Sequence, residues 1–197
     1  MTGRITTRPA TPRDAASMAI LVDIAGHGLP AYFWSSAVAR GEAYSMLEVG
    51  RERAMRDEGS FSWRNATMAE IDGAVAGMLV GYRQPDSPEV TDPEDYDPAV
   101  RPLIELEPLS RASWYINVLA SFAEFRDQGV GTALLREAER IARQTEARAL
   151  SLIVEDVNDG AMRLYRRHGF TEIARRRFLP FAQCHPVHNW ILMERVL

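Results

Sequence analysis

Apolar and polar residues alternate in several short stretches of the chain, which is the pattern of half-buried β-strands. The first stretch, residues 4–8, is rich in β-branched residues and predicts an N-terminal strand. Two longer stretches flank Asp72-Gly73, and that dipeptide between strand-like runs predicts a β-hairpin over residues 63–70 and 74–82. Four further strands are expected over residues 114–119, 149–154, 170–178 and 189–196.

Between these strands, apolar residues recur at helical spacing, which predicts helices. Thr11, Pro12 and Asp14 together form a helix-start signal, with a capping hydroxyl, a proline in the first turn and an acid at the third position. The helix that follows should end near Gly26-His27-Gly28. Further helices are expected over residues 42–57, 132–145 and 159–168.

Residues 83–111 differ in composition from the rest of the chain. They contain six prolines and eight acidic residues against three arginines. A strand begins soon afterwards at Trp114, so this segment fits an acidic, proline-rich insertion better than a linker between two domains. The order of elements then predicts one α/β domain over residues 1–197.

The chain contains no lysine, because all 23 residues in the Lys and Arg count are arginine. This excludes Schiff-base enzymes, which need a side-chain amine. It also excludes a Walker A loop, which needs a lysine on the phosphates. Coding bias toward arginine codons is the simplest explanation for the composition.

Charge and cysteine content narrow the class of protein further. The net charge of −4 disfavours a general nucleic-acid binder. The single Cys184 excludes an intrachain disulfide and suits a reducing compartment. The start of the chain has no apolar run typical of a signal peptide, and the longest apolar stretch, residues 74–82, is much shorter than the roughly 20 residues of a membrane helix. We therefore expect a soluble cytoplasmic protein with no nucleic-acid or membrane partner.

A glycine-containing turn lies between a predicted strand and a predicted helix. Its sequence is Arg126-Asp127-Gln128-Gly129-Val130-Gly131. Glycines allow positive φ and close backbone approach, so successive N–H groups can converge at the helix N-terminus. This arrangement is typical of a pyrophosphate site. A turn with glycines placed for packing alone is the alternative.

A second segment begins at Asn158, which is a natural N-cap after a strand. Tyr165 follows two helical turns later, so the two side chains share one face of the predicted helix. Gly169 is suited to the C-terminal end of that helix and leads into Phe170.

Together these segments resemble the GNAT superfamily of N-acetyltransferases, which use acetyl-CoA. The pyrophosphate motif of that family, Arg/Gln-x-x-Gly-x-Gly/Ala, matches residues 126–131. Its Asn…Tyr-x-x-x-Gly-Phe segment matches Asn158, Tyr165, Gly169 and Phe170. The resemblance implies a central mixed, mostly antiparallel sheet that is splayed between its two middle strands and flanked by helices.

The resemblance also implies a set of residues that bind acetyl-CoA. The backbone of Val118, Leu119 and Ala120 would hydrogen-bond the pantetheine arm and polarise the thioester carbonyl. Asn158 would contact the same arm. The pyrophosphate would lie on Arg126, Asp127, Gln128, Gly129, Val130, Gly131 and Thr132.

Acetyl transfer to an amine needs two proton movements, one from the amine and one to the departing thiolate. Tyr165, with a reference pKa of about 10, is implied as the proton donor to the thiolate. No enzyme nucleophile is required, so we expect direct attack in a ternary complex. Several relatives carry a glutamate early in the central strand, but Ser113, Tyr115 and Asn117 are the polar residues here. The base therefore stays open among a water chain, Glu70, Glu155, His185 and His188.

Two other groups of residues have competing interpretations. Cys184, His185 and His188 offer only three potential metal ligands, interrupted by proline and without a second cluster, so we expect no metal. Six arginines could form an anion-binding patch, although a solvated surface is the favoured interpretation. They are Arg163, Arg166, Arg167, Arg175, Arg176 and Arg177.

The acidic insertion suits a cationic acceptor such as a polyamine, an aminoglycoside-like amine or a peptide N-terminus. We therefore expect the partner to be a small-molecule amine or a peptide amine. The closing strands or the insertion could also form a homodimer interface. The alternative function is a non-catalytic acyl-CoA-binding or regulatory module that keeps the glycine turn but lacks a base.

Overall fold

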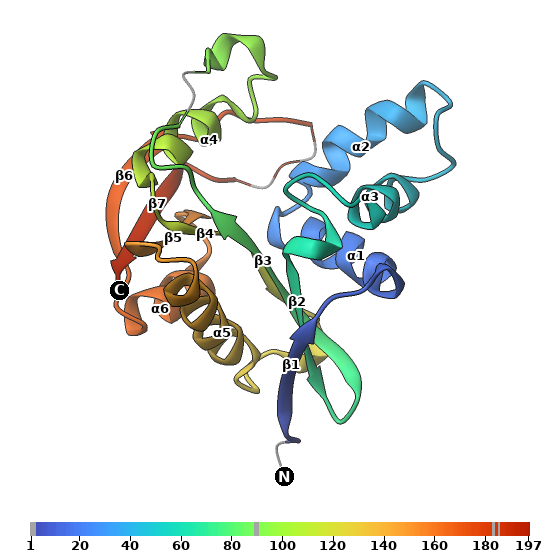
Figure 1. Ribbon diagram of the computed structural model, residues 1–197. Helices are drawn as coiled ribbons and strands as arrows, with labels where there is room; N and C mark the ends of the chain where they lie inside the picture. Colours follow the sequence, from blue (N-terminus) through green and yellow to red (C-terminus); the bar gives the residue numbers. More distant parts are fainter. Residues whose placement is uncertain (1–2, 89–90, 183, 185) are drawn as a thin grey trace. The chain divides into compact units, whose positions relative to one another are not determined.

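The computed structural model describes residues 3–88, 91–182, 184 and 186–197 (Figure 1). Its seven strands are β1 Ile5–Pro9, β2 Ala66–Ile71, β3 Ala74–Arg83, β4 Trp114–Ser121, β5 Ala149–Glu155, β6 Thr171–Arg177 and β7 Asn189–Val196. Its α-helices are α1 Ala15–Ala25, α2 Leu29–Ala39, α3 Met46–Met55, α4 Arg101–Leu106, α5 Val130–Gln144 and α6 Asp159–Arg167.

The strands form a seven-stranded sheet in the order β1-β2-β3-β4-β5-β7-β6. Strand β4 runs parallel to β5, whereas the β1–β2, β2–β3, β5–β7 and β6–β7 pairs are antiparallel. The prediction of an α/β fold with a mixed, mostly antiparallel sheet is therefore confirmed. The β4–β5 ladder pairs only Trp114–Ile116 with Leu150–Leu152.

Most predicted elements are present, but the region between β1 and β2 differs from expectation. The first helix ends where predicted, and a further helix, α2, begins directly after Gly28 and was missed. The next helix was expected from Glu42 but starts at Met46. Ser45 caps it by accepting a hydrogen bond from the Glu48 N–H at 3.2 Å, and Glu48 in turn accepts one from the Tyr44 N–H at 2.8 Å. These two hydrogen bonds determine where the helix begins.

Two other segments depart from the strand and insertion predictions. The strand expected from Trp63 begins instead at Ala66, after a short 3₁₀ turn over Trp63–Asn65. The acidic insertion contains helix α4, and a 3₁₀ turn over Glu107–Ser110, here labelled η4, follows it directly.

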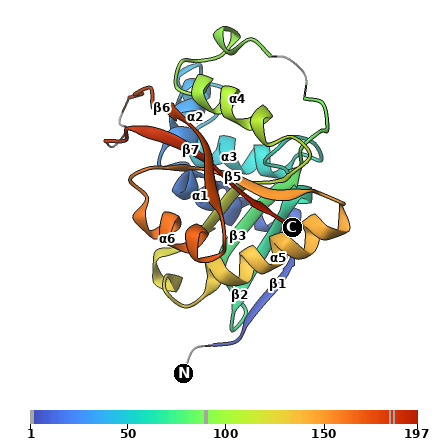
Figure 2. The ribbon, with the colours of Figure 1, turned by 90° about the vertical axis from the view of Figure 1, so that its left-hand side faces the viewer.

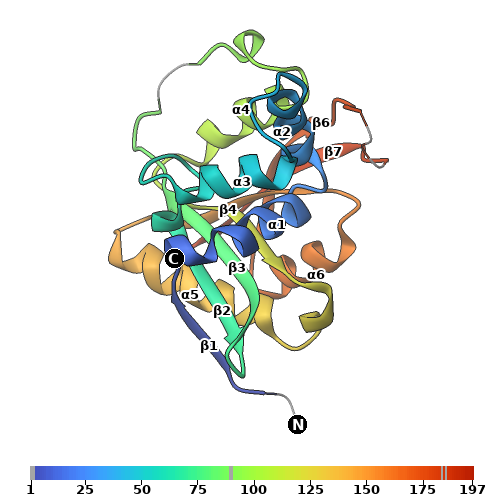
Figure 3. The same ribbon diagram turned by 90° about the vertical axis from the view of Figure 1, so that its right-hand side faces the viewer.

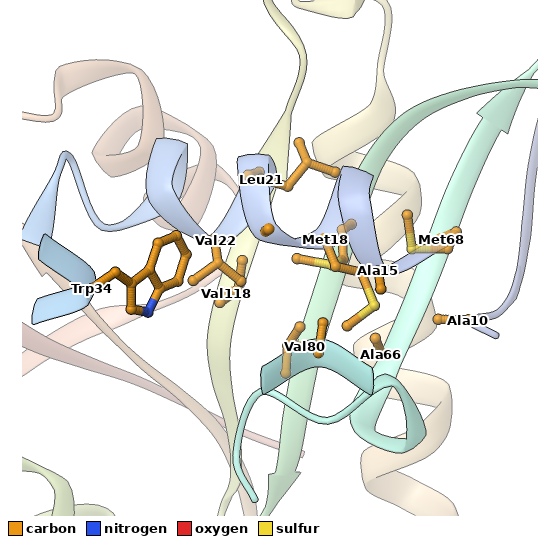
Figure 4. Close-up of a cluster of buried hydrophobic side chains, with 14 residues drawn as sticks. Ala10, Ala15, Met18, Leu21, Val22, Trp34, Ala66, Met68, Val80 and Val118 are labelled. Atoms are coloured by element: carbon orange, nitrogen blue, oxygen red, sulfur yellow. The ribbon is translucent and has the colours of Figure 1, made fainter. Parts of the chain in front are cut away.

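The chain divides into two compact units, which are described separately. The first unit contains β1, α1, α2, α3, β2, nearly all of β3, the second half of β4 and the first half of α5. Helices α1 and α3 lie across one face of β2 and β3 (Figure 3). Met18 and Leu21 of α1 are fully buried in a cluster that also holds Met68 of β2 and Val80 of β3 (Figure 4). This apolar layer is the core of the first unit.

An arginine on β1 links that strand to two other elements of the first unit. Arg8 Nε donates to Glu70 Oε1 of β2 at 2.7 Å, and Arg8 Nη2 donates to Asp14 Oδ1 at 2.8 Å. Asp14 also accepts a hydrogen bond from the Thr11 N–H at 2.7 Å, as the helix-start signal predicts. The hydrogen bond from Arg8 is the main cause that lowers the pKa of Asp14 to about 2, and the Thr11 N–H contributes to it.

The second unit contains the first half of β4, the second half of α5, and β5, α6, β6, β7 and α4. Strand β7 is central here, because it pairs with β5 along its whole length and with β6 on its other side. Helix α4 lies against β6 and β7 (Figure 2). Leu150, Leu152 and Leu192 are completely or almost completely buried in this unit.

None of the helices in the described part of the chain is both long and apolar enough to span a membrane.

The Asp14→Asn variant should lose about 1–2 kcal/mol of unfolding free energy at pH 7, after allowance for the partly exposed arginine. A carboxylate whose pKa is lowered by folding stabilises the protein above its unfolded pKa of 3.8, and this stabilisation is lost as the pH falls through about 2. Urea unfolding at several pH values should show the two proteins converging in acid. The control, Asp57→Asn, breaks an exposed pair with Arg64 and should change stability by less than about 0.5 kcal/mol. A constant difference between Asp14→Asn and the parent at all pH values would contradict this account.

Candidate active site

Strand β4 presents different groups on its two faces in the first unit. Val118 and Ala120 are buried in the apolar cluster with α1, whereas Leu119 is only half-buried. Their side chains therefore serve packing, and only their backbone groups are suited to hold a ligand. The ladder with β5 ends at Ile116, so no described β5 residue pairs with this part of β4.

A close approach of two strands holds this part of β4 in place. A Cβ atom at Gly77 of β3 would lie 2.5 Å from the Ala120 carbonyl oxygen and 2.8 Å from Val130 Cγ1. The Phe122 N–H, just beyond β4, donates to the Ala76 carbonyl oxygen at 3.0 Å. Glycine at position 77 is thus required for β3 to support both β4 and the start of α5.

The predicted glycine turn lies directly before α5. Gly129 has a φ of 91° and Asp127 a φ of 60°, so the chain makes its sharp bend at these two residues. Gly131 instead lies in the first turn of α5, where the backbone is right-handed, so only one of the two motif glycines uses positive φ. Gln128 Nε2 donates to the Glu124 carbonyl oxygen at 2.8 Å, which stabilises the bend.

The same turn has the electrostatics of an anion site. The first N–H groups of a helix have no partner within it, and the helix dipole places partial positive charge there. Arg126 is exposed and makes no ion pair with a described residue. The described chain therefore offers a guanidinium and helix N–H groups in one segment.

Asn158 and Tyr165 both belong to the second unit. Asn158 caps α6, because its Oδ1 accepts a hydrogen bond from the Ala161 N–H at 3.2 Å. The predicted cap is confirmed. The amide nitrogen of Asn158 is left for another contact. At the other end of α6, Gly169 has a φ of 83°, as expected for a residue that ends a helix.

Tyr165 lies two turns along α6 and is 6% exposed. Its ring packs against Phe170, with the ring centroids 5.8 Å apart. Burial raises the pKa of the phenol well above 10. The hydroxyl therefore keeps its proton through the whole physiological pH range.

The comparisons with known proteins agree with this geometry. The model of the acetyltransferase (GNAT) family matches residues 30–170. The chain belongs to this family.

Solved structures with the same fold span nearly the whole chain. One acetyltransferase is 21% identical, with a TM-score of 0.65 over 97% of this chain and 98% of that one. An N-acetyltransferase from Staphylococcus aureus Mu50 is 18% identical, with a TM-score of 0.65 over 96% and 100%. A ribosomal-protein-alanine N-acetyltransferase from Brucella melitensis is 20% identical, with a TM-score of 0.62 over 98% and 99%. At these identities the likeness concerns the fold. Comparison with curated proteins gives no match.

The residues considered as the base of this GNAT protein lie in different surroundings. Glu70 pairs with Arg8 at 2.7 Å, and Glu155 is 4% exposed. His188 is exposed, and its backbone N–H donates to Asp156 at 3.2 Å. His185 lies outside the described residues.

Sequence reasoning missed a group of polar residues in the second unit. Glu107, at the start of η4, lies next to Tyr115 of β4, and the Tyr115 hydroxyl donates a hydrogen bond to its carboxylate. Tyr82 of β3 packs against Tyr115 with ring centroids 5.8 Å apart. Burial raises the pKa of Glu107, and the amide of Gln84 and the hydroxyl of Tyr115 oppose that rise. No local motif around Glu107 marks it, since it occurs among many acids of the insertion.

The metal and arginine-patch alternatives gain no support from the described residues. Within them, no three His, Cys, Asp or Glu side chains are grouped to hold a metal ion. Arg175 pairs with Glu172 at 2.6 Å, and Arg176 pairs with Glu105 at 2.5 Å. These two guanidinium groups are therefore neutralised within the protein.

The Gly77→Ala variant should be markedly destabilised, by roughly 1–3 kcal/mol, because the added methyl meets a backbone oxygen that cannot move without shifting β4. Thermal unfolding measures this effect. The matched control is Gly160→Ala in the first turn of α6, where a Cβ meets nothing closer than 3.9 Å. That variant should be neutral or slightly more stable. Equal stability of the two variants would show that the close approach at Gly77 is not required.

Proposed function

We propose that this GNAT protein is an acetyl-CoA-dependent N-acetyltransferase that acts on a primary amine by direct attack in a ternary complex. The observation that carries the proposal is the family match over the segment containing both the glycine turn and Tyr165. We infer the cosubstrate from the family, because its members use acetyl-CoA. The acceptor class follows from the acidic character of residues 83–111.

The residues present fit acetyl-CoA. In the proposal, Arg126 and the N–H groups at the start of α5 hold the pyrophosphate, because a lysine-free chain must use guanidinium and backbone donors. The backbone of Val118, Leu119 and Ala120, which lies beyond the β4–β5 ladder, holds the pantetheine arm. The amide nitrogen of Asn158 adds a contact to the same arm. Acetyl-CoA supplies the activated acetyl group.

Tyr165 acts as the proton donor to the leaving sulfur. Its raised pKa means that the phenol is present as a donor at every pH at which the protein is active. The same raised pKa lowers the driving force for early proton transfer. Tyr165 therefore stabilises the thiolate by hydrogen bonding as its charge develops, and then completes the transfer.

The test of the function is coenzyme A release from acetyl-CoA in the presence of a panel of primary amines. The parent protein should release coenzyme A with at least one amine, and Tyr165→Phe should lower kcat by about 100-fold with less than a twofold change in the KM for acetyl-CoA. The control, Tyr44→Phe, alters a tyrosine that is 98% exposed and should behave as the parent. Equal losses in kcat and in coenzyme affinity would contradict the donor role. Stabilisation by acetyl-CoA without turnover on any amine would favour the non-catalytic binding module.

The Gly129→Ala variant tests the pyrophosphate site. A side chain at a φ of 91° is strained by roughly 1–2 kcal/mol, so the turn should open and the KM for acetyl-CoA should rise about tenfold. Steady-state kinetics and titration calorimetry with coenzyme A measure the change. Gly73→Ala is the matched control, because it has a similar φ of 82° in the β2–β3 hairpin with no atom within 4 Å. If both variants weaken coenzyme binding equally, the turn before α5 is not the site.

A further inference from the structure

Glu107 is unusual among the acidic residues of the insertion, because it is only partly exposed, burial raises its pKa, and it has no cation partner among the described residues. Glu105, two positions earlier, pairs with Arg176 at 2.5 Å. Glu194 pairs with Arg148 at 2.7 Å. A carboxylate that is partly removed from water and has no cation partner lowers the free energy of unfolding. The presence of a glutamate at this position therefore needs a reason other than stability.

A cavity of about 410 Å³ lies beside Glu107 in the second unit. Gln84 and Glu107 provide polar groups of its wall, while Tyr96, Ile104 and Pro108 provide apolar surface. This volume lies near the lower end of the range for small-molecule sites, which is roughly 300–1,000 Å³. The cavity is therefore the right size for a small ligand.

Gln84 provides an independent sign of a ligand. It is only 9% exposed, and its Nε2 makes no well-formed hydrogen bond with a described residue, although the amide lies close enough to Glu107 to lower the pKa of that carboxyl. Its backbone N–H donates to the Ser113 carbonyl oxygen at 2.8 Å, which holds the residue next to the start of β4. A buried amide that is held in place without a well-formed hydrogen bond is suited to bind a group that enters the cavity.

One tyrosine, Tyr115, interacts with both Glu107 and the proposed proton donor. Tyr115 donates a hydrogen bond to Glu107, and Tyr165 lies close enough to act electrostatically on Tyr115. All three residues belong to the second unit. The buried Tyr115 thus interacts with both the carboxylate of Glu107 and the phenol of Tyr165.

We propose that this cavity binds the acceptor amine and that Glu107 receives its ammonium group and takes its proton. This inference rests on the proposed acetyltransferase function and adds the base and the acceptor class to it. The acceptor is a small primary amine with one ammonium, an apolar body that packs on Ile104 and Pro108, and an oxygen that accepts from Gln84 Nε2. Glu107 thereby gains a cation, and Gln84 Nε2 a well-formed hydrogen bond, which neither has among the described residues.

The proton transfers balance as follows. The carboxylate form of Glu107 takes one proton from the ammonium and leaves a neutral amine with a free electron pair. That pair forms the new C–N bond to the acetyl carbon while the C–S bond breaks, and Tyr165 gives its proton to the sulfur. The excess proton on the new amide nitrogen restores the phenol, and Glu107 releases its proton to water. One acetyl-CoA and one ammonium yield one amide, one thiol and one proton.

The Glu107→Gln variant tests this role against Glu105→Gln, an acid two positions away outside the cavity wall. At pH 7, Glu107→Gln should lower kcat/KM for the amine at least 100-fold, while Glu105→Gln should stay within threefold of the parent. Glu107→Asp, which keeps the carboxylate, should recover part of the loss. The probes are ethylamine, tyramine and spermidine with acetyl-CoA, and tyramine should be used best because it carries one ammonium, an apolar ring and an oxygen.

Two further measurements separate catalysis from structure. The groups facing Glu107 are Tyr115, Tyr82 and Gln84, and no described arginine or histidine pairs with it, so its raised pKa should place the acid limb of kcat/KM above pH 4.5. That limb should disappear in Glu107→Gln. A carboxyl whose pKa is raised by folding destabilises the protein once it is ionised, so Glu107→Gln should melt at the same or a higher temperature at pH 7.

Binding of the amine alone gives a readout that does not depend on acetyl transfer. Tyramine should raise the melting temperature of the parent in the absence of acetyl-CoA, and this shift should be lost in Glu107→Gln. Unchanged turnover and an unchanged tyramine shift in that variant would overturn the inference while leaving the acetyltransferase function in place. A lower melting temperature with matching losses in Glu107→Gln and Glu107→Asp would assign Glu107 a structural role and also overturn it. If the parent acetylates no amine but acetyl-CoA stabilises it, the proposed function itself fails.

Discussion

The short parallel ladder between β4 and β5 is the constraint on which the proposed coenzyme site depends. Because the ladder ends at Ile116, the backbone of β4 beyond it is not used by β5. The close approach at Gly77 and the hydrogen bond from Phe122 to Ala76 then hold that backbone from the other side. A strand whose side chains are buried and whose main chain has one unused edge can bind a ligand without flexible side chains, which limits the entropy lost on binding.

Two carboxylates of the chain show opposite uses of the same chemical group. Asp14 is paired with Arg8, so its pKa falls and its charge stabilises the fold. Glu107 is partly buried with no guanidinium partner among the described residues, so its pKa rises and its charge destabilises the fold. The chain has arginines available for pairing, as Glu105 and Glu194 show. A carboxylate left without one next to a cavity is therefore better explained by a cation that arrives from solution than by stability.

The lysine-free composition gains a structural meaning from these contacts. The ion pairs that tie β1 to β2 and β5 to β7 use guanidinium groups, which can bind two acceptors or one carboxylate through two nitrogens. Arg8 contacts two acids in this way, and Arg148 holds both oxygens of Glu194. An anion site in such a chain must likewise depend on arginine and main-chain N–H groups.

The sequence by itself determined the features that depend on neighbouring residues. The start signal at Thr11–Asp14, the Asp72-Gly73 turn, the bend at Gly129 and the Asn158 cap were all predictable, because each is set by backbone conformation within a few residues. The motif residues that carry the family resemblance are of this kind. Helix α2 was missed because its aromatic residues do not show a clear apolar stripe, and only their packing reveals it. The surroundings of Glu107 were decided by the tertiary structure alone. Its partners Gln84, Tyr82 and Tyr115 come from distant parts of the chain, and burial and charge at a residue depend on which segments pack around it rather than on its neighbours in sequence.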